Sequence, residues 1–237
     1  MKRGLVCVAF AALFAMISGC ATSGRSNYSY APPSTKVTPT SEILVDEPFD
    51  AVWDRLVGRL ATGFFVINNI DKASRLINVS YSSDSPGDFV DCGRSTRQFA
   101  FKDEAQTYTY AVADSSTFKT AGTWGPMKNL AVVGEISRRP SVEGRINLYV
   151  APVSPTATKV TANVKYVFKV TVGGLSTAYN AFGGVVNQAP IPQNTSDISF
   201  STAEGGAKEW GMPPNVETIR CQSTGKLEQS LLEKAKP

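Results

Sequence analysis

The four cysteines are the residues of this sequence best suited to chemistry: Cys7, Cys20, Cys92 and Cys221. A cysteine can be acylated, join a disulfide, bind a metal or act as a nucleophile. The 237 residues include no histidine, which excludes Ser-His-Asp and Cys-His catalysis, histidine-ligated zinc and histidine pH switches. Because no base is available to activate a thiol, we expect a protein that is not an enzyme and that has no cofactor and no metal site.

The first 19 residues have the pattern of an export signal. Lys2 and Arg3 form a short basic region, and residues 4–17 are an almost uncharged apolar run. A run of this length suits a signal peptide and is too short to span a bilayer. We therefore expect residues 1–19 to be removed, and Cys7 to be lost with them.

The segment Ile17-Ser18-Gly19-Cys20 resembles the lipobox of bacterial lipoproteins. This resemblance implies that the Cys20 thiol carries a diacylglyceryl group and that its new amino group is acylated, with palmitate as the expected chain. Several acyl chains, at about 0.8 kcal/mol per buried CH2, hold a protein firmly in a membrane. Because Ala21 rather than aspartate follows, the resemblance also implies the periplasmic face of the outer membrane. The alternative is an ordinary secretory signal cut after Ala21.

Cys92 and Cys221 are the two thiols left after cleavage and acylation. In an exported chain an even pair of cysteines favours a disulfide, because the periplasm is oxidising. The bond would close a loop of about 130 residues and contribute at most about 4 to 5 kcal/mol. The sequence thus predicts a structural disulfide between them.

The charge balance gives little support for a polyanionic partner. The chain has 24 basic and 20 acidic residues, with two of the basic ones in the signal. Lys159, Lys165 and Lys169 alternate with apolar residues, as on the solvent face of a strand. We therefore expect no nucleic-acid partner.

Composition divides the mature chain into a tether and one domain. Residues 20–40 are rich in Ser, Thr, Pro, Gly and Tyr and have almost no aliphatic side chains, which predicts a flexible tether. Such a tether could hold the domain, residues 41–237, tens of ångströms from the bilayer. In an alternative interpretation, Tyr28 and Tyr30 contact lipid headgroups or a partner.

Hydrophobic periodicity predicts the elements of the domain. A helix is expected between Glu47 and Gly63, where Val52, Trp53 and Leu56 belong to one apolar stripe. The segment 115–144 has a possible strand at 130–136 but otherwise predicts a long excursion from the sheet. A closing helix is expected at 224–235. Strands are expected at 43–45, 64–70, 76–81, 99–101, 107–112, 145–150, 159–172 and 197–201.

Residues 173–194 are rich in Gly and Asn and predict a mobile loop. The loop also has scattered apolar side chains, and these make it a candidate contact surface. The candidate contact residues are Tyr179, Phe182, Val185 and Val186.

Three acidic residues in a turn-rich stretch, Asp84, Asp88 and Asp91, could bind calcium weakly, although their order departs from that of an EF-hand loop. Glu47 and Asp91 are the acids most suited to a catalytic pair. Their cap and turn positions explain them without a function, so we assign them no role.

The order of predicted elements indicates an α+β fold, in which a curved antiparallel sheet packs against an N-terminal and a C-terminal helix. The helix stretch Phe49–Leu56, the Gly63–Ile67 stretch and the stretch Ile70–Val79 resemble the repeated helix-grip domain of BamC-type lipoproteins, accessories of the outer-membrane β-barrel assembly machine. The resemblance covers stretches between residues 49 and 79. This chain has one such unit where that family has two, and it adds the Cys92 and Cys221 pair.

The same order of elements also resembles START-like proteins, which hold apolar ligands between sheet and helix. Two hypotheses follow from these resemblances. In the first, a lipid-anchored lipoprotein acts by protein contact as an accessory or structural part of an envelope complex, with β-barrel assembly as one such complex. In the second, a periplasmic module binds a lipid or another hydrophobic ligand. A binder needs a cavity beside the helix, whereas a contact protein is packed solid there.

Overall fold

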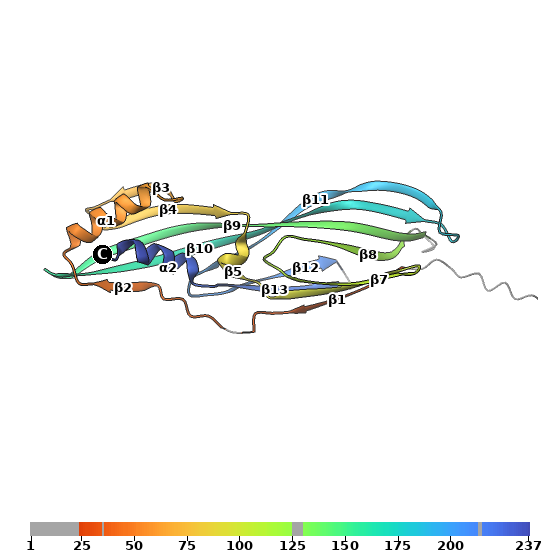
Figure 1. Cartoon of the computed structure of the whole chain (residues 1–237), viewed down its shortest axis with the longest axis horizontal. Helices are drawn as coiled ribbons and strands as arrows, with labels where there is room; N and C mark the ends of the chain where they lie inside the picture. Colours follow the sequence, from red (N-terminus) through yellow and green to blue (C-terminus); the bar gives the residue numbers. More distant parts are fainter. Residues whose placement is uncertain (1–23, 35, 125–129, 213–214) are drawn as a thin grey trace, which may run out of the picture.

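The computed structural model describes residues 24–34, 36–124, 130–212 and 215–237, and it is an elongated, mostly β structure (Figure 1). Strands account for 64 % and helices for 13 % of the described chain. The α+β prediction is therefore wrong. The sequence contained more strand than its hydrophobic pattern indicated, because several strands are polar, rich in Gly or interrupted by Pro.

A seven-stranded antiparallel sheet runs the length of the molecule. Its path is β11-β10-β9-β4-β3, with β2 paired to β10 and β8 paired to β9. The two longest strands, β9 and β10, therefore have different neighbours at their two ends. The bounds are β2 Glu42–Val45, β3 Val66–Asp71, β4 Leu76–Ser83, β8 Ser116–Trp124, β9 Leu130–Ser154, β10 Ala157–Tyr179 and β11 Val185–Ser201.

Strand β10 confirms the predicted alternation of buried and solvent-facing residues. Val160, Val164, Tyr166 and Phe168 are buried, and Lys165 on the opposite face is exposed. The strand extends well beyond the predicted 159–172 in the direction of Tyr179. Period-2 patterning therefore identified the buried middle of β10 but not its far end.

The segment 115–144 is not an excursion from the sheet, because it contains β8 and the first half of β9. Pro140 had indicated an interruption. It lies in β9 after the last residue paired with β8, Arg138, and before the first paired with β4, Val142. In this gap β9 has a neighbour only on the β10 side, so a missing N–H is tolerated.

Two smaller three-stranded sheets complete the β structure. One has the order β1-β6-β7 and the other β12-β13-β5. A short 3-10 helix, η1, precedes β5. The bounds are β1 Gly24–Ala31, η1 Pro86–Asp88, β5 Val90–Asp91, β6 Arg94–Phe101, β7 Glu104–Ala111, β12 Gly206–Met212 and β13 Asn215–Ser223.

Much of the segment expected to be a tether belongs to the folded domain. Strand β1 pairs along its whole length with β6, from Gly24 opposite Phe101 to Ala31 opposite Arg94. Its burial alternates, with Tyr28 and Tyr30 partly buried. Tyrosines two residues apart were therefore the signal for a strand, which the lack of aliphatic residues obscured.

Two helices lie at one end of the molecule, near the C-terminus (Figure 1). Helix α1, Phe49–Ala61, buries Val52, Trp53, Leu56 and Leu60 and confirms the predicted helix. Helix α2, Lys226–Leu232, and the 3-10 helix η2, Glu233–Ala235, form the closing helical segment. Among the described helices, none combines the length and apolar character needed to cross a membrane.

The residues expected in a mobile loop at 173–194 form the end of β10, a tight turn and most of β11. Gly174 is required by close packing, since a Cβ there would lie 2.0 Å from the Glu135 carbonyl oxygen. Pro190 is accommodated because β11 is the outer strand of the sheet path. Gly and Pro therefore mark local irregularities of a hairpin here rather than a loop.

Candidate functional site

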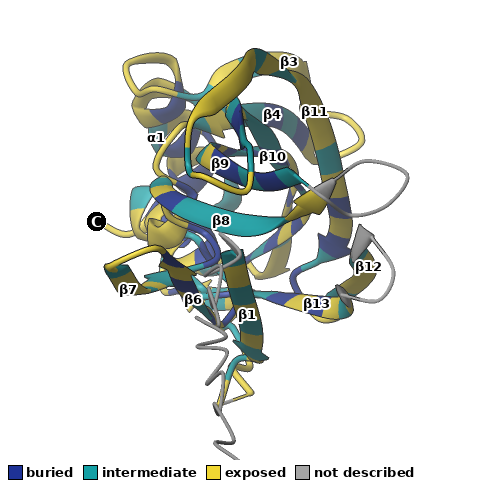
Figure 2. Cartoon of the chain, turned by 90° about the vertical axis from the view of Figure 1, so that its right-hand side faces the viewer, coloured by how far each residue is buried: buried dark blue, intermediate teal, exposed yellow. Residues whose placement is uncertain are grey.

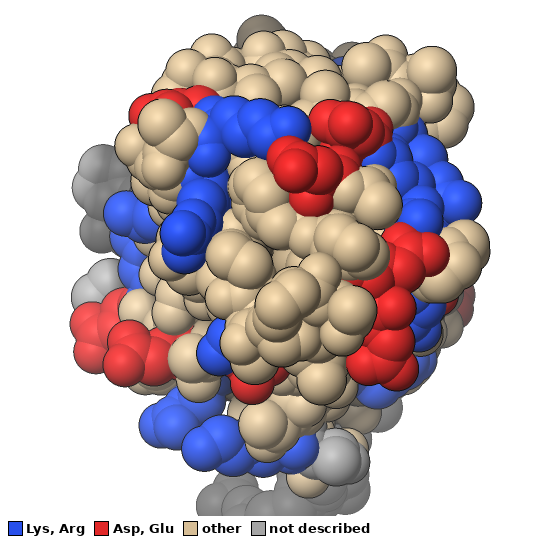
Figure 3. Space-filling model, turned by 90° about the vertical axis from the view of Figure 1, so that its left-hand side faces the viewer, with Lys and Arg blue, Asp and Glu red and all other residues tan. Residues whose placement is uncertain are grey.

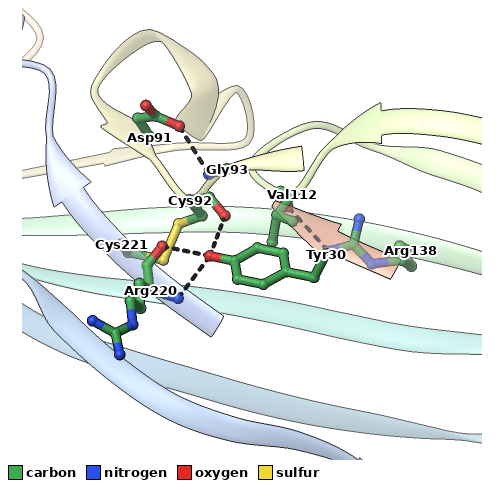
Figure 4. The surroundings of a disulfide bond; sticks show 8 residues. All are labelled: Tyr30, Asp91, Cys92, Gly93, Val112, Arg138, Arg220 and Cys221. Carbon is green, nitrogen blue, oxygen red and sulfur yellow. Dashed lines mark hydrogen bonds between the residues drawn. A yellow bond between two sulfur atoms is a disulfide. The ribbon is translucent and has the colours of Figure 1, made fainter. Parts of the chain in front are cut away.

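The predicted disulfide is confirmed: Cys92 and Cys221 are bonded at a sequence separation of 129. It joins β13 to the segment between β5 and β6 (Figure 4). The Tyr30 hydroxyl lies between the two sides, accepting from the Arg220 backbone nitrogen at 2.9 Å and lying 3.1 Å from the carbonyl oxygens of Cys92 and Arg220. Strand β1 is thereby fastened to the disulfide-linked region.

The other residues selected from the sequence do not form a chemical site. Cys20 lies outside the described residues. Asp91 accepts a hydrogen bond from the Gly93 nitrogen at 2.8 Å, as a turn residue does. Within the described ranges no group of three or more acidic or cysteine side chains could hold a metal ion, so the weak calcium site at Asp84, Asp88 and Asp91 has no support.

The four contact residues are separated by the β10–β11 turn. Tyr179 is half-buried and packs against Phe101, with 4.7 Å between ring centroids. Phe182 is 97 % exposed, and Val185 and Val186 are also exposed. Of the predicted set, three residues thus form an exposed tip and one belongs to the core beneath it.

A hydroxyl cluster near α2 has groups that could suit catalysis but is closed to solvent. The Tyr166 and Ser223 hydroxyls are 3.1 Å apart, and Ser223 also lies 3.1 Å from both carboxylate oxygens of Glu228. Tyr166 and Glu228 are fully buried. Burial raises the pKa of Tyr166, and the negative charge of Glu228 raises it further. The cluster is therefore a structural network without access for a substrate.

Cations and aromatic rings gather in a cleft of about 510 Å³, which we call the arginine cleft. It lies where the β1-β6-β7 sheet meets β8, β9 and the β12–β13 hairpin; seen along the long axis, β1, β6 and β7 lie below β8 (Figure 2). We define it by Tyr28, Arg97, Tyr110, Lys119, Arg138 and Trp210.

Arg97 is held in place by aromatic rings. Its guanidinium carbon lies 4.2 Å from the centroid of Tyr28 and 4.4 Å from that of Phe118. Its Nε donates to the Tyr110 hydroxyl at 2.9 Å. Stacking and one hydrogen bond orient the guanidinium and leave its Nη groups without an acceptor among the described residues.

Arg138 approaches the cleft from β9 and is only 6 % exposed. Its Nη2 donates to the Val112 carbonyl at 3.0 Å, a bond visible in Figure 4, and its Nη1 to the Ser116 hydroxyl at 3.2 Å. Its guanidinium lies 4.9 Å from the centroid of the Tyr110 ring. Burial lowers the pKa of Arg138, and the nearby charge of Arg97 lowers it further. An arginine nevertheless remains protonated.

No carboxylate of the described chain forms an ion pair with either arginine. Lys119, by contrast, is paired with Glu104 at 2.8 Å. Trp210 adds a buried indole nitrogen that has no hydrogen-bond partner within the described structure. The cleft therefore combines two uncompensated cations with a free donor, which together suit an anion.

Glu217 is an acidic residue close to Tyr28. It is paired in register with Trp210, and its charge raises the pKa of Tyr28, although burial is the larger cause. One carboxylate oxygen of Glu217 is buried without a partner among the described residues. Because Tyr28 stays protonated, its hydroxyl can donate, and the cleft is dominated by donors rather than bases.

Sequence reasoning missed this cleft because its residues come from separate strands. Arg97 is on β6, Arg138 on β9 and Trp210 on β12. Nothing in the local sequence around Arg138-Arg139 distinguishes a buried cation from a surface one. Tyr28, Arg97 and Tyr110 lie on three different strands. Their proximity can be recognised only once the pairing of β1, β6 and β7 is known.

No protein-family model, no curated protein and no solved structure matches this chain. The function must therefore be inferred from the sequence signals and from the geometry of the cleft and the tip.

Proposed function

We propose that this protein is a lipid-anchored lipoprotein on the periplasmic face of the outer membrane, and that it acts by contact with another envelope protein. The Ile17–Cys20 segment supports the anchor and the location. The arginine cleft is the proposed contact site, where it receives a carboxylate of the partner. The absence of histidine from the whole sequence supports binding rather than acid–base catalysis.

The observation that carries this proposal is the pair of arginines without an acidic partner. Two guanidinium groups that face the same partly buried space repel each other unless a negative charge lies between them. The rings that stack on Arg97 fix its orientation before any ligand arrives, so little entropy is lost on binding. A carboxylate can accept two parallel hydrogen bonds from such a guanidinium.

The partner can be identified by co-purification from detergent-solubilised envelopes with the full lipidated chain. The resemblance of residues 49–79 to β-barrel assembly accessories makes the assembly machine the first candidate. Recovery of its components supports that assignment, and recovery of other secretion or cell-wall proteins assigns the contact to them. Recovery of bound lipid alone contradicts a function through protein contact.

Replacing Arg97 by glutamine is expected to weaken binding of the partner roughly 30-fold, because truncating one side of a buried charged contact costs about 2 kcal/mol or more. The dissociation constant of the purified pair measures this effect. Arg94→Gln is the matched control, since Arg94 is on the same strand and exposed. Equal affinities for the two variants, with both folded by circular dichroism, would contradict a role for the cleft.

Replacing Cys20 by serine is expected to release the protein from membranes, because the acyl chains are the proposed anchor. Fractionation of cells into soluble and membrane pools measures the change, with Cys7→Ser as the control that leaves Cys20 in place. A Cys20→Ser variant that still sediments with membranes would contradict the anchor.

The alternative of a hydrophobic ligand held between helix and sheet gains no support from the packing. Val52, Leu56 and Leu60 on the inner face of α1 are fully buried. The sheet residues opposite, such as Leu148 and Val150, are buried as well. Burial of both facing surfaces supports solid packing between helix and sheet rather than a ligand cavity there.

A further inference from the structure

The first described residue of the chain lies at the end of the molecule remote from the helices. A Cβ on Gly24 would lie 2.6 Å from the Ala121 Cβ. Ala121 is opposite Val133, and Val133 is opposite Thr177, two residues before the end of β10. Figure 1 shows β1 beginning at this end and running toward the helices. We call this end the distal end.

The position of Gly24 limits how far the proposed lipid anchor can be from the distal end. Cys20 is four residues before Gly24. A chain covers at most about 3.3 to 3.6 Å per residue, so the anchor lies within about 14 Å of Gly24. Strand β10 alone, with 23 residues, spans roughly 70 Å. The distal end, and not the helical end, must therefore be next to the bilayer.

The distal end exposes an apolar tip made of Phe182, Val185 and Val186 at the β10–β11 turn. Phe182 is 97 % exposed, Val185 61 % and Val186 54 %. The turn is well fastened, because the Asn180 side-chain oxygen accepts from the nitrogens of Phe182 at 3.0 Å and Gly184 at 2.9 Å. An ordered turn that groups three exposed apolar side chains suits burial in another phase.

The charges around the tip favour a lipid surface. No residue between Lys169 and Asp197 is charged. The nearest cation is Lys102 in the β6–β7 turn, whose Nζ donates to the Gly183 carbonyl at 3.0 Å and lies 5.0 Å from the Tyr179 ring centroid. An apolar tip with a lysine beside it matches the boundary between headgroups and acyl chains.

The opposite end of the molecule carries charges of both signs. Figure 3 shows basic and acidic residues around a central uncharged area of this face. Among them, Lys72 lies 2.8 Å from Asp50, and Lys159 lies 3.4 Å from Glu42. Ion pairs of this kind would lose their hydration at a membrane surface.

We propose that the tip inserts Phe182 and its two valines into the headgroup region of the bilayer that holds Cys20. This inference rests on the proposed lipid anchor. The distal end of the molecule then contacts the membrane. The long axis points away from the membrane, and the helical end lies in the periplasm. The lipid chains and the tip form two attachments, and together these fix the orientation of the protein.

Depth-dependent quenching in vesicles tests the insertion. The full lipidated chain is reconstituted into vesicles of phosphatidylethanolamine and phosphatidylglycerol, with and without brominated acyl chains. In Phe182→Trp, the added emission is expected to shift to the blue and to lose roughly half of its intensity to bromine, because the tip lies at the depth of an interfacial side chain. Phe64→Trp is the matched control, since Phe64 is 94 % exposed and precedes β3 near the helices.

The emission of the unsubstituted chain, which has three tryptophans, is subtracted from both variants. Flotation of the same vesicles reports the anchor separately. Floating protein in which both added tryptophans keep the spectrum of water-exposed indole overturns the insertion and leaves the anchor standing. Protein that does not float overturns both. A blue shift at position 182 without bromine quenching overturns the insertion in favour of contact between copies of this chain at the tip.

Discussion

Replacing Cys92 and Cys221 together by serine is expected to lower the free energy of unfolding by about 4 to 5 kcal/mol. The bond closes a loop of 129 residues, and in the chain-entropy model a loop of this length constrains the unfolded chain by about that amount. A domain is stable by only about 5 to 15 kcal/mol, so the loss is a large fraction of the total. Denaturation with guanidinium chloride under non-reducing conditions measures it.

The unsubstituted protein in a reducing agent provides the control for this prediction. Its denaturation midpoint should fall to that of the double serine variant. The variant itself should not change with reducing agent, since neither thiol remains. Unsubstituted protein and variant with the same midpoint under oxidising conditions would mean that the bond adds no stability.

Replacing Glu228 by alanine is expected to cost about 3 to 5 kcal/mol. Glu228 is fully buried on α2, and its Oε1 accepts from the Thr202 hydroxyl at 2.8 Å and from Ser223 at 3.1 Å. Its removal takes away the carboxylate that both hydroxyls bond, which leaves them only the Val164 carbonyl oxygen and the Tyr166 hydroxyl as acceptors, and it opens a cavity beneath the closing helix. Urea denaturation of the folded variant, compared with the unsubstituted chain, measures the loss.

Two further substitutions distinguish the loss of the buried hydrogen-bond network around Glu228 from the loss of a carboxylate charge. Glu228→Gln keeps the shape and one acceptor oxygen, so its cost should be clearly smaller than that of alanine. Glu233→Ala removes a half-exposed carboxylate paired with Lys236 in the next turn, and the change should stay within about 0.5 kcal/mol. A Glu228→Ala variant no less stable than Glu233→Ala would show that the buried network does not stabilise the fold.

The sequence identified elements wherever one face is strongly apolar. Helix α1 was predicted because Val52, Leu56 and Leu60 recur at helical spacing, and the middle of β10 because its valines alternate with lysines. Such patterns are set by burial against a single core. They do not depend on knowing which distant segment forms the other side of that core.

The hydrophobic pattern did not predict strands that are stabilised by backbone pairing rather than by apolar side chains. Strand β1 has tyrosine, serine and glycine on its inner side and exists because β6 supplies a complete ladder. The end of β10 contains two consecutive glycines and is a strand because β9 and β11 lie on both sides. Backbone hydrogen bonds of this kind leave little trace in composition.

The disulfide and the arginine cleft also differ in how far the sequence predicts them. The Cys92–Cys221 bond could be predicted because the chemistry of a lone cysteine pair depends on the compartment more than on the fold. The arginine cleft could not, since Arg97 and Arg138 come from strands that do not pair with each other. Its cationic character arises because neither arginine forms an ion pair within the described structure, which is a property of the assembled chain.

The pairing of β1 with β6 determines how the protein responds to mechanical force. A pull on the proposed lipid anchor would act on the chain at Gly24, along the axis of β1 and away from the helices. The hydrogen bonds of an antiparallel ladder are perpendicular to the strands, so this force shears all eight register pairs at once instead of opening them one by one. Tyr30, which pairs with Ser95 near the far end of the ladder, resists the same displacement through its hydrogen bond to Cys92 at the Cys92–Cys221 bond. The pairing of β1 with β6 is therefore most resistant to a force applied along β1.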